Sequence, residues 1–342
     1  MFLRSFIGNR DFFFVDLLSG TGVRGIRVAL EVGGCGVLND IDPRALYYIR
    51  KNIALNGLEA RLEAYNNEAN TLLNMLVFSG LQVDYIDVDP YGSPVPFLDS
   101  TFKPIGRESF IGITATDTAP LTCTYPHKAL SRYWDHCVKV DFEKEYAARL
   151  LIANVTMRAS ALEVELTPLL TVVQEYFIRV FFRARRSASG AYKKINECIG
   201  YIWYCEKTLE RGFIKTLEEA RDVKCIDGSK PVLLGKTWTC EIGAQEAVLR
   251  MLNESSKTPW IQEKALKVLR TLEKEVVINT PYIRLDRLCS ILKVNMPNIE
   301  KLLTNLNAAG VKCTRTHMDP RGIRVDSDYN TLISAILSAL RT

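Results

Sequence analysis

Residues 12–25 read FFFVDLLSGTGVRG, an apolar run that ends in a carboxylate and passes into a glycine-rich turn. A short apolar run bounded by turn residues is typical of a buried strand. The turn contains the pattern Gly-x-Gly-x-x-Gly, whose glycines let the backbone approach a ligand and whose following helix offers free N–H groups. The pattern alone is a weak signal. Its place between an expected strand and an expected helix favours a nucleotide-type cofactor over a purely structural turn.

The sequence on either side of this turn alternates between apolar strands and helical segments. Asp42 and Pro43 predict a helix start, because Asp is a favoured N-cap and Pro a favoured first-turn residue, and Asn56-Gly57 predicts the helix end. This β-α-β-α order predicts an α/β fold with a doubly wound parallel sheet. The expected strands are 12–18, 36–39, a segment before residue 67, 83–88 and the first part of 109–121, and the expected helices end near residue 31, span 43–55 and span 70–78.

The rest of the chain contains three further kinds of segment. A helix near 141–160 precedes two β-rich segments, 164–173 and 176–186, and residues 198–242 consist of short strands and turns. From about residue 246 the pattern is helical and ends in a basic hairpin, which is the outline of a winged-helix-like unit. We therefore expect three domains, with the boundaries 1–195, 196–245 and 246–342.

The composition excludes several classes of protein. The chain has 342 residues, of which 47% are hydrophobic and 24% charged, as in ordinary globular proteins. No apolar run approaches the roughly 20 residues that cross a bilayer, and residues 1–16 resemble the lead-in to a strand rather than a signal peptide. Nine cysteines without regular spacing predict reduced thiols and a cytoplasmic location. The net charge of +5 is weak support for a polyanionic partner, and no obligate protein partner is evident.

Two acidic residues near the glycine turn bear on the identity of the cofactor. Asp40 follows the second expected strand, where a carboxylate suits the ribose hydroxyls of either a dinucleotide or S-adenosylmethionine. An NAD-dependent oxidoreductase is therefore an open alternative. Asp16, four residues before Gly20, favours S-adenosylmethionine, because a carboxylate there can face an ammonium or sulfonium group. The pyrophosphate of NAD is already negative and has little use for this anion.

Residues 87–94, DVDPYGSP, follow the strand expected at 83–88 and supply a carboxylate and an aromatic ring on a stiff turn. A carboxylate that accepts the hydrogens of an exocyclic amine aims its nitrogen and can take up the proton lost on methylation. An aromatic ring beside it can stack on an extruded base. We assign the first role to Asp89 and the second to Tyr91, with Asp87 as a weaker candidate. In the alternative, Asp89 only caps the next element and Tyr91 packs in the core.

Together these motifs resemble one family, the archaeal and eukaryotic tRNA (guanine-26-N2)-dimethyltransferases. The resemblance covers residues 16–327 and is carried by DLLSGTGVRGIR, LNDIDPRA, DVDPYGSP, TATDTAPL and RTHMDPRGIRVD. It implies a class I, Rossmann-like methyltransferase that transfers one or two methyl groups from S-adenosylmethionine to the N2 of a tRNA guanine. The guanine at position 26 is the expected target.

The resemblance also implies roles for single residues. Asp89 is the expected catalytic carboxylate, and Tyr91 the expected aromatic that holds the guanine. Glu68 and Ala69 match the place where the family contacts the adenine ring. The other expected cofactor contacts are Asp16, Gly20, Gly22, Arg24 and Asp40, and the expected walls of the base pocket are Pro90, Asp117 and Pro120, for which a plain turn is the alternative.

The N-terminus departs from the family pattern. Relatives have a further segment before the first strand, with an Asn-Arg-Asp helix start and an aromatic that helps to hold the guanine. Asn9-Arg10-Asp11 spells the same tripeptide but lies too close to Asp16 for the intervening helix, so we expect a coincidence. Either the true start lies upstream, or part of the site is lost and the chain binds tRNA without methylating it.

The connecting region lacks the family's zinc ribbon. Cys205 and Cys225 occupy ribbon positions, but Thr208 and Gly228 stand where each pair needs a second cysteine, and Cys198 and Cys240 are mis-spaced. We expect hydrogen-bonded hairpins without a metal.

Two basic clusters are candidate tRNA contacts. Such residues can neutralise phosphates of a structured RNA, although solvated strand ends are the alternative. His317 is expected to be structural rather than catalytic. The first cluster comprises Arg183, Arg185 and Arg186 with Lys193 and Lys194, and the second comprises Lys312, Arg315, His317, Arg321 and Arg324, of which Arg315 and Arg321 are the preferred contacts.

Overall fold

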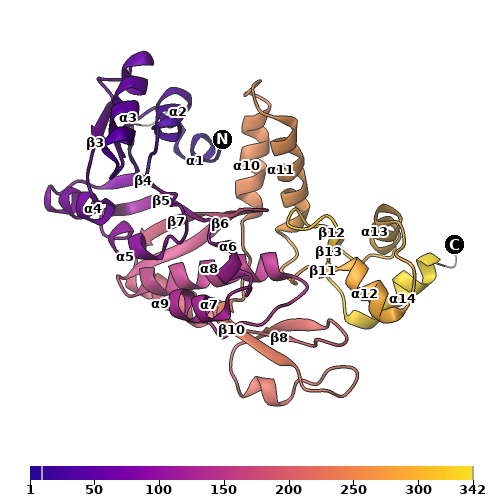
Figure 1. Cartoon of the computed structure of the whole chain (residues 1–342). Helices are drawn as coiled ribbons and strands as arrows, with labels where there is room; N and C mark the ends of the chain where they lie inside the picture. The colour runs from indigo at the N-terminus through magenta and orange to yellow at the C-terminus, as the bar shows by residue number, and fades with distance from the viewer. Residues whose placement is uncertain (9–10, 341–342) are drawn as a thin grey trace.

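The computed structural model describes residues 1–8 and 11–340, so the prediction about Asn9-Arg10-Asp11 falls largely outside the described residues. Its centre is a seven-stranded sheet in the order β3-β2-β1-β4-β5-β7-β6 (Figure 1). The first five strands along the chain are parallel, which confirms the doubly wound α/β fold. The strands are β1 Phe13–Asp16, β2 Cys35–Asn39, β3 Leu62–Tyr65, β4 Val83–Val88, β5 Ile105–Ala115, β6 Val164–Gln174 and β7 Phe177–Arg186.

β6 and β7 extend the parallel sheet as an antiparallel hairpin. Only Glu175 and Tyr176 separate the two strands, and so short a connection joins antiparallel strands, whereas parallel ones need a crossover. β7 is also antiparallel to β5, with Thr114 opposite Arg179 and Glu108 opposite Arg185. The chain in β7 therefore starts at the carboxyl end of the parallel strands and leaves at their amino end.

The helices between the parallel strands begin and end close to the expected residues. Asp42 caps α3 by accepting a hydrogen bond from the Arg44 N–H at 2.8 Å, as its sequence predicts. α8 is buried on nearly all sides, because it packs against both β6 and β10 (Val232–Trp238) of a second sheet. The helices of this part are α2 Val23–Glu31, α3 Pro43–Leu55, α4 Ala69–Phe78, α5 Leu98–Thr101, α6 Thr118–Leu121, α7 Pro126–Tyr133, α8 Glu143–Ser160 and α9 Ala188–Cys198, with a 3₁₀ turn at Val95–Phe97.

The N-terminal residues form a helix, α1 Phe2–Ile7, where only a lead-in to a strand was expected. Phe2 explains the difference. Its ring stacks on Phe181 of β7 with 4.4 Å between centroids and meets the edge of Phe110 of β5 at 5.9 Å. This burial of apolar surface on the sheet stabilises a helix too short to persist alone.

The remaining elements form a small sheet and a C-terminal unit, which lies at the far end of the molecule from α3 and α4 (Figure 1). The order of β11, α12, α13, β12 and β13 is that of a winged-helix-like unit, as expected, and we propose to keep the domain boundaries 1–195, 196–245 and 246–342. The elements are β8 Ile199–Tyr204, β9 Arg211–Ile214, a 3₁₀ turn at Glu219–Arg221, β10 Val232–Trp238, α10 Gln245–Ser255, α11 Glu263–Glu275, β11 Ile283–Arg284, α12 Leu285–Leu292, α13 Ile299–Ala308, β12 Cys313–Arg315, β13 Gly322–Val325 and α14 Tyr329–Leu340.

A buried charge network connects α8, α11 and the hairpin of the C-terminal unit. Arg324 of β13 contacts Glu145 of α8 and Glu275 of α11, each at 2.9 Å, and Glu145 pairs with Arg149 at 2.8 Å. His317 contacts Glu275 through Nδ1 at 2.6 Å, and its Nε2 accepts a hydrogen bond from the Val173 N–H. An accepting Nε2 makes the ring neutral. Two carboxylates therefore balance two guanidinium groups, in a site almost without solvent.

The prediction of reduced thiols was wrong for six of the nine cysteines. The structure pairs Cys123 with Cys137, Cys198 with Cys240 and Cys205 with Cys225. The partners lie 14, 42 and 20 residues apart along the chain, so no short-range spacing of cysteines predicts these pairs. Cys35 is exposed and free, whereas the free thiols of Cys289 and Cys313 are buried.

A thiol titration checks this pairing. In denaturant without reductant, we expect a chromogenic disulfide reagent to react with three of the nine cysteines, and with all nine after reduction. In the native protein only Cys35 should react quickly, because burial raises the pKa of the Cys289 and Cys313 thiols and blocks access. Nine reactive thiols before reduction would contradict the pairing.

No helix among the described residues is long and apolar enough to span a membrane.

Candidate active site

The glycine turn lies between β1 and α2 at the carboxyl end of the sheet. Gly20 and Gly22 have φ values of +58° and +79°, a backbone conformation that strains other residues. A Cβ on Gly22 would also lie 3.0 Å from the side chain of Leu38. Asp40 supports the turn from β2, because its Oδ2 accepts a hydrogen bond from the Gly20 N–H at 2.8 Å. The turn is thus held open for close approach by a ligand.

Asp16 lies beneath this turn. Its carboxyl group is buried, and its Oδ2 accepts a hydrogen bond from the Gly25 N–H at 2.9 Å. Burial, followed by repulsion from Asp87, raises the pKa of Asp16 to about 7. Asp16 is therefore poised to lose a proton when a cation binds nearby.

Glu68 and Ala69 begin α4 at the same edge of the sheet. Glu68 is the N-cap and accepts hydrogen bonds from the N–H groups of Asn70 and Thr71 at 3.0 and 2.8 Å. Burial by itself would raise the pKa of Glu68, but the hydrogen bonds from these N–H groups have the larger effect, so the pKa is lowered. Asn39, at the end of β2, donates to the carbonyls of Leu17 and Asn67 and so ties the ends of three strands together. The expected cofactor residues of β1, β2 and α4 thus meet at one edge.

Asp89 and Tyr91 follow β4 at this edge. The Asp89 side chain is 26% exposed, and Tyr91 is fully exposed. The alternative in which Tyr91 packs in the core is therefore wrong. Pro90 is buried, and Gly92 is fastened to Thr116 after β5, with the Gly92 N–H donating at 2.6 Å and the Thr116 N–H donating back at 2.9 Å. The turn is rigid at its base and presents an open aromatic ring.

A charge cluster built on Asp87 lies next to Asp89. The buried Asp87 accepts hydrogen bonds from Arg24 at 2.9 Å and from Arg179 at 2.5 Å. Burial raises the pKa of Asp87, but the guanidinium groups of Arg179 and Arg24 outweigh it and lower the pKa. Arg24 also contacts Asp89 directly, and Arg179 Nη1 lies 4.0 Å from Asp89 Oδ2. Asp87 is expected to be the weaker candidate for the catalytic carboxylate. In the structure it holds Arg24 and Arg179 in place beside Asp89.

No motif in the sequence marks Arg179 or the residues that contact it. Arg179 donates to Thr114 Oγ1 at 2.6 Å, and its guanidinium lies 4.7 Å from the centre of the Phe181 ring. Gly112 makes room, because a Cβ there would lie 2.7 Å from the Tyr85 hydroxyl and 2.9 Å from Arg179 Nη2. Every second residue of β7 points to this face. Only that alternation, combined with the register against β5, could have singled out Arg179.

Asp117 and Pro120 follow β5, beside the turn of Asp89. Both Asp117 oxygens are engaged, one by Arg132 at 2.9 Å and the other by the Tyr133 hydroxyl at 2.8 Å. Tyr133 also lies 2.9 Å from Ser93 Oγ. Tyr133 thus connects α7 to the turn of residues 89–94, Asp117 holds Tyr133 and Arg132 in place, and Pro120 is buried beside them.

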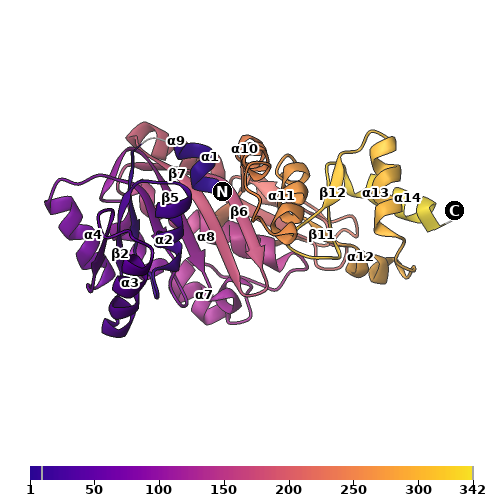
Figure 2. The same cartoon turned by 90° about the horizontal axis from the view of Figure 1, so that it is seen from above.

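The first basic cluster lies away from this edge. Arg185 is six residues along β7 from Arg179, which corresponds to about 20 Å toward the amino ends of the parallel strands. Figure 2 shows α9, which follows this cluster, and α7 near opposite ends of the strands. Arg185 pairs with Glu108 at 2.6 Å, and Arg186 donates to the carbonyl of Ile105 at 3.2 Å, whereas Arg183 is half-buried. The structure does not bring Arg183, Arg185 and Arg186 to the site.

The second basic cluster is divided by burial. Arg324 and His317 belong to the buried network, so the expectation that they contact phosphates was wrong, whereas the structural role expected for His317 is confirmed. Arg315 pairs with Glu300, and Arg321 pairs with Asp286 at 3.0 Å while staying 58% exposed. Arg321 and Arg315 therefore remain candidate contacts.

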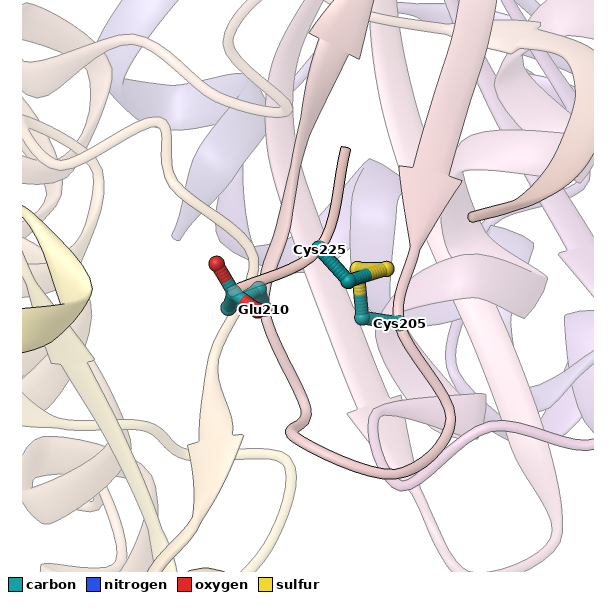
Figure 3. A group of neighbouring side chains, drawn as sticks. All are labelled: Cys205, Glu210 and Cys225. Atoms are coloured by element: carbon teal, nitrogen blue, oxygen red, sulfur yellow. A yellow bond between two sulfur atoms is a disulfide. The ribbon is translucent and has the colours of Figure 1, made fainter. Parts of the chain in front are cut away.

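The two ribbon cysteines lie together. Figure 3 shows the disulfide between Cys205 and Cys225, with Glu210 beside it. Glu210 accepts hydrogen bonds from the Ile226 N–H at 2.8 Å and from the Thr208 hydroxyl at 2.7 Å. The disulfide and these hydrogen bonds close the hairpin, and the paired sulfurs are not thiolates.

The sheet order, the glycine turn after β1 and the acidic residues after β1, β2 and β4 define a Rossmann-like methyltransferase of class I. Comparison with known proteins agrees. A chain from Sulfolobus acidocaldarius described as tRNA (guanine(26)-N(2))-dimethyltransferase is 33% identical, over 94% of this chain and 82% of the relative. One of the same description from Pyrobaculum aerophilum is 36% identical, over 93% and 80%.

A solved structure has the same fold. Trm1 from Pyrococcus horikoshii, in complex with S-adenosyl-L-methionine, superposes with a TM-score of 0.85 and 24% identity, covering 98% of this chain and 90% of that one. The family described as N2,N2-dimethylguanosine tRNA methyltransferase matches residues 6–337. The chain belongs to this family.

Proposed function

We propose that this chain transfers one or two methyl groups from S-adenosylmethionine to the exocyclic N2 of a guanine in tRNA, the activity after which its family is named. The target that we propose is the guanine at position 26, as in the relatives. The observation that carries the proposal is Asp89 at the carboxyl edge of the sheet, next to the fully exposed ring of Tyr91. An NAD-dependent oxidoreductase has no use for this pair, and family membership does not favour it.

The residues around the glycine turn fit the cofactor. The positive φ values of Gly20 and Gly22 leave a cradle without side chains, and Asp16 offers a buried carboxyl group beneath it. S-adenosylmethionine, when bound, supplies a methyl group activated by its sulfonium. Its amino and hydroxyl groups are donors that suit carboxylates. The residues that would hold it are Asp16, Gly20, Gly22, Arg24, Asp40, Glu68 and Ala69.

The residues after β4 would act on the guanine. Tyr91 offers an open aromatic face on which an extruded base can stack. Asp89 would accept the hydrogens of the N2 amine, orient its lone pair and take up the proton that methylation releases. Arg24 and Arg179, both held by Asp87, fix the carboxylate from one side. Pro90, Asp117 and Pro120 would keep the turn rigid.

A transfer assay tests this function. Purified protein is incubated with labelled S-adenosylmethionine and an unmodified tRNA transcript, and a transcript with adenine at position 26 serves as the control. We expect incorporation into the first transcript only, with N2-methylated guanine after digestion. Binding without incorporation would instead support the alternative of a tRNA-binding protein without catalysis, and equal labelling of both transcripts would contradict position 26.

The pKa of Asp16 predicts the pH dependence of cofactor binding. Because this pKa is raised to about 7, the carboxyl group is mostly protonated below pH 7 and ionised above it. An ionised carboxylate binds an ammonium group better, so the Kd of S-adenosylhomocysteine should fall several-fold between about pH 6 and pH 8. Calorimetric titration at several pH values measures this. Asp16→Asn should bind weakly at every pH, and a wild-type Kd that is the same across this range would refute the assignment.

We propose tRNA as the partner and the cytoplasm as the compartment, because tRNA is modified there. Disulfides are rare in most cytosolic proteins but common in intracellular proteins of hyperthermophiles.

A further inference from the structure

Residues 123–137, to which the sequence analysis gave no role, form a closed hairpin next to the proposed guanine site. The Cys123–Cys137 disulfide joins its ends, and α7 lies between them. Tyr133, the last residue of α7, contacts Ser93, two residues after Tyr91. The hairpin is therefore rigid and is attached to the turn that would hold the reacting base.

Two exposed aromatic residues flank α7. Tyr125 precedes the helix and Trp134 follows it, with 54% and 57% of their surfaces exposed. Nine residues at 1.5 Å per residue place them about 13 Å apart. Lys128 Nζ lies 5.3 Å from the centre of the Tyr125 ring, and the Arg158 guanidinium lies 4.7 Å from the Trp134 ring. Each ring therefore makes a cation–π contact with a basic side chain of the same chain.

Residues 123–137 contribute no exposed carboxylate, although Arg132 pairs with the mostly buried Asp117 and the adjacent Arg158 pairs with the exposed Asp99. Asp135 is the only acidic residue in 123–137, and it is buried and hydrogen-bonded to the hydroxyl of Tyr146. Lys128 is exposed and Arg132 partly exposed. Aromatic faces interleaved with cations match the chemistry of RNA, since bases stack on the rings and phosphates pair with the cations.

We propose that this hairpin, defined by Tyr125, Lys128, Arg132, Trp134 and the adjacent Arg158, docks the tRNA beside the reacting guanine. The inference rests on the proposed function, because it takes tRNA as the substrate. Arg185 of the first basic cluster lies six residues along β7 from Arg179, or about 20 Å, and pairs with Glu108. The hairpin, in contrast, contacts the turn that carries Tyr91, through Tyr133 and Ser93.

Two matched double variants test the docking surface. Tyr125→Ala/Lys128→Ala removes one exposed ring and its cation, and Lys257→Ala/Trp260→Ala removes a comparable pair between α10 and α11, where Trp260 is 58% exposed and the Lys257 side chain 64%. Fluorescence anisotropy gives the Kd for an unmodified tRNA transcript at several salt concentrations. We expect the first variant to bind at least tenfold more weakly and to lose about one unit of salt slope, and the second to change less than about twofold.

Calorimetry with S-adenosylhomocysteine should show the same Kd for both variants, because neither touches the cofactor edge. Trp134→Asn is a further single variant, since Asn tolerates the φ of +60° at this position, and it should also weaken tRNA binding. Normal tRNA binding by the first double variant, or an equal loss in the control variant, would overturn the proposal. A wild-type protein that binds tRNA but methylates none would instead contradict the proposed function.

Discussion

Replacing Asp89 with alanine should lower the rate of methyl transfer to tRNA by about 100- to 10,000-fold, the range typical for loss of a positioned acid–base group. The Kd of S-adenosylhomocysteine should change less than about twofold. The reason is geometric. Asp89 lies after β4, whereas Asp16 ends β1 and the glycine turn follows it, and Arg24 keeps its bond to Asp87 when Asp89 is removed. Single-turnover transfer and calorimetric titration measure the two effects separately.

Asp89→Asn is the matched control for this prediction. It keeps the size of the side chain but loses the charge, so it should be impaired nearly as strongly as the alanine variant if the carboxylate takes up a proton. An asparagine variant with wild-type activity would show that the charge is not needed. Equal losses of transfer and of cofactor affinity in the alanine variant would contradict the assigned role.

Replacing Arg324 with methionine should reduce the free energy of unfolding by about 3–5 kcal/mol, the usual cost of breaking a buried ion pair from one side. Arg324 contacts both Glu145 and Glu275, and its own side chain is 1% exposed. Without it, Glu145 keeps Arg149 and Glu275 keeps neutral His317, so that two buried carboxylates have one guanidinium group between them in this network. Because the network joins α8 and α11 to the C-terminal hairpin, thermal unfolding should also lose cooperativity between these parts.

Arg321→Met provides the comparison, three residues away on the same hairpin. Arg321 is 58% exposed and pairs with Asp286 at the surface, and such pairs contribute at most about 1 kcal/mol. Chemical denaturation of the two variants under identical conditions measures the difference. If both variants lose the same small amount, the buried network does not hold the parts together.

The sequence predicted the elements whose signals are local. Asp42-Pro43 begins α3 because an N-cap and a first-turn proline act within a few residues of each other. The glycine turn was recognised for the same reason, since Gly20 and Gly22 adopt backbone conformations that few other residues tolerate. Asp16, Asp40 and Asp89 could be placed at one edge because each follows a strand of an expected parallel sheet.

The predictions that failed depended on which residues meet across the fold. Arg321 and Arg324 look alike in the sequence, yet one is at the surface and the other is buried between two carboxylates. The role of Arg179 could not be predicted either, because its partner Asp87 lies 92 residues away. The cysteine pairs could not be predicted because they span up to 42 residues.

By itself the sequence therefore determined the strand and helix order, the glycine cradle and the carboxylates at the ends of the strands, because short-range backbone preferences and hydrophobic periodicity decide these features. Only the tertiary structure decided which arginines face solvent and which hold buried carboxylates, that Asp87 fixes two cations beside Asp89, and that α7 contacts the turn of residues 89–94. Those facts follow from the register of β5 against β7 and from packing between distant helices, which no local pattern encodes.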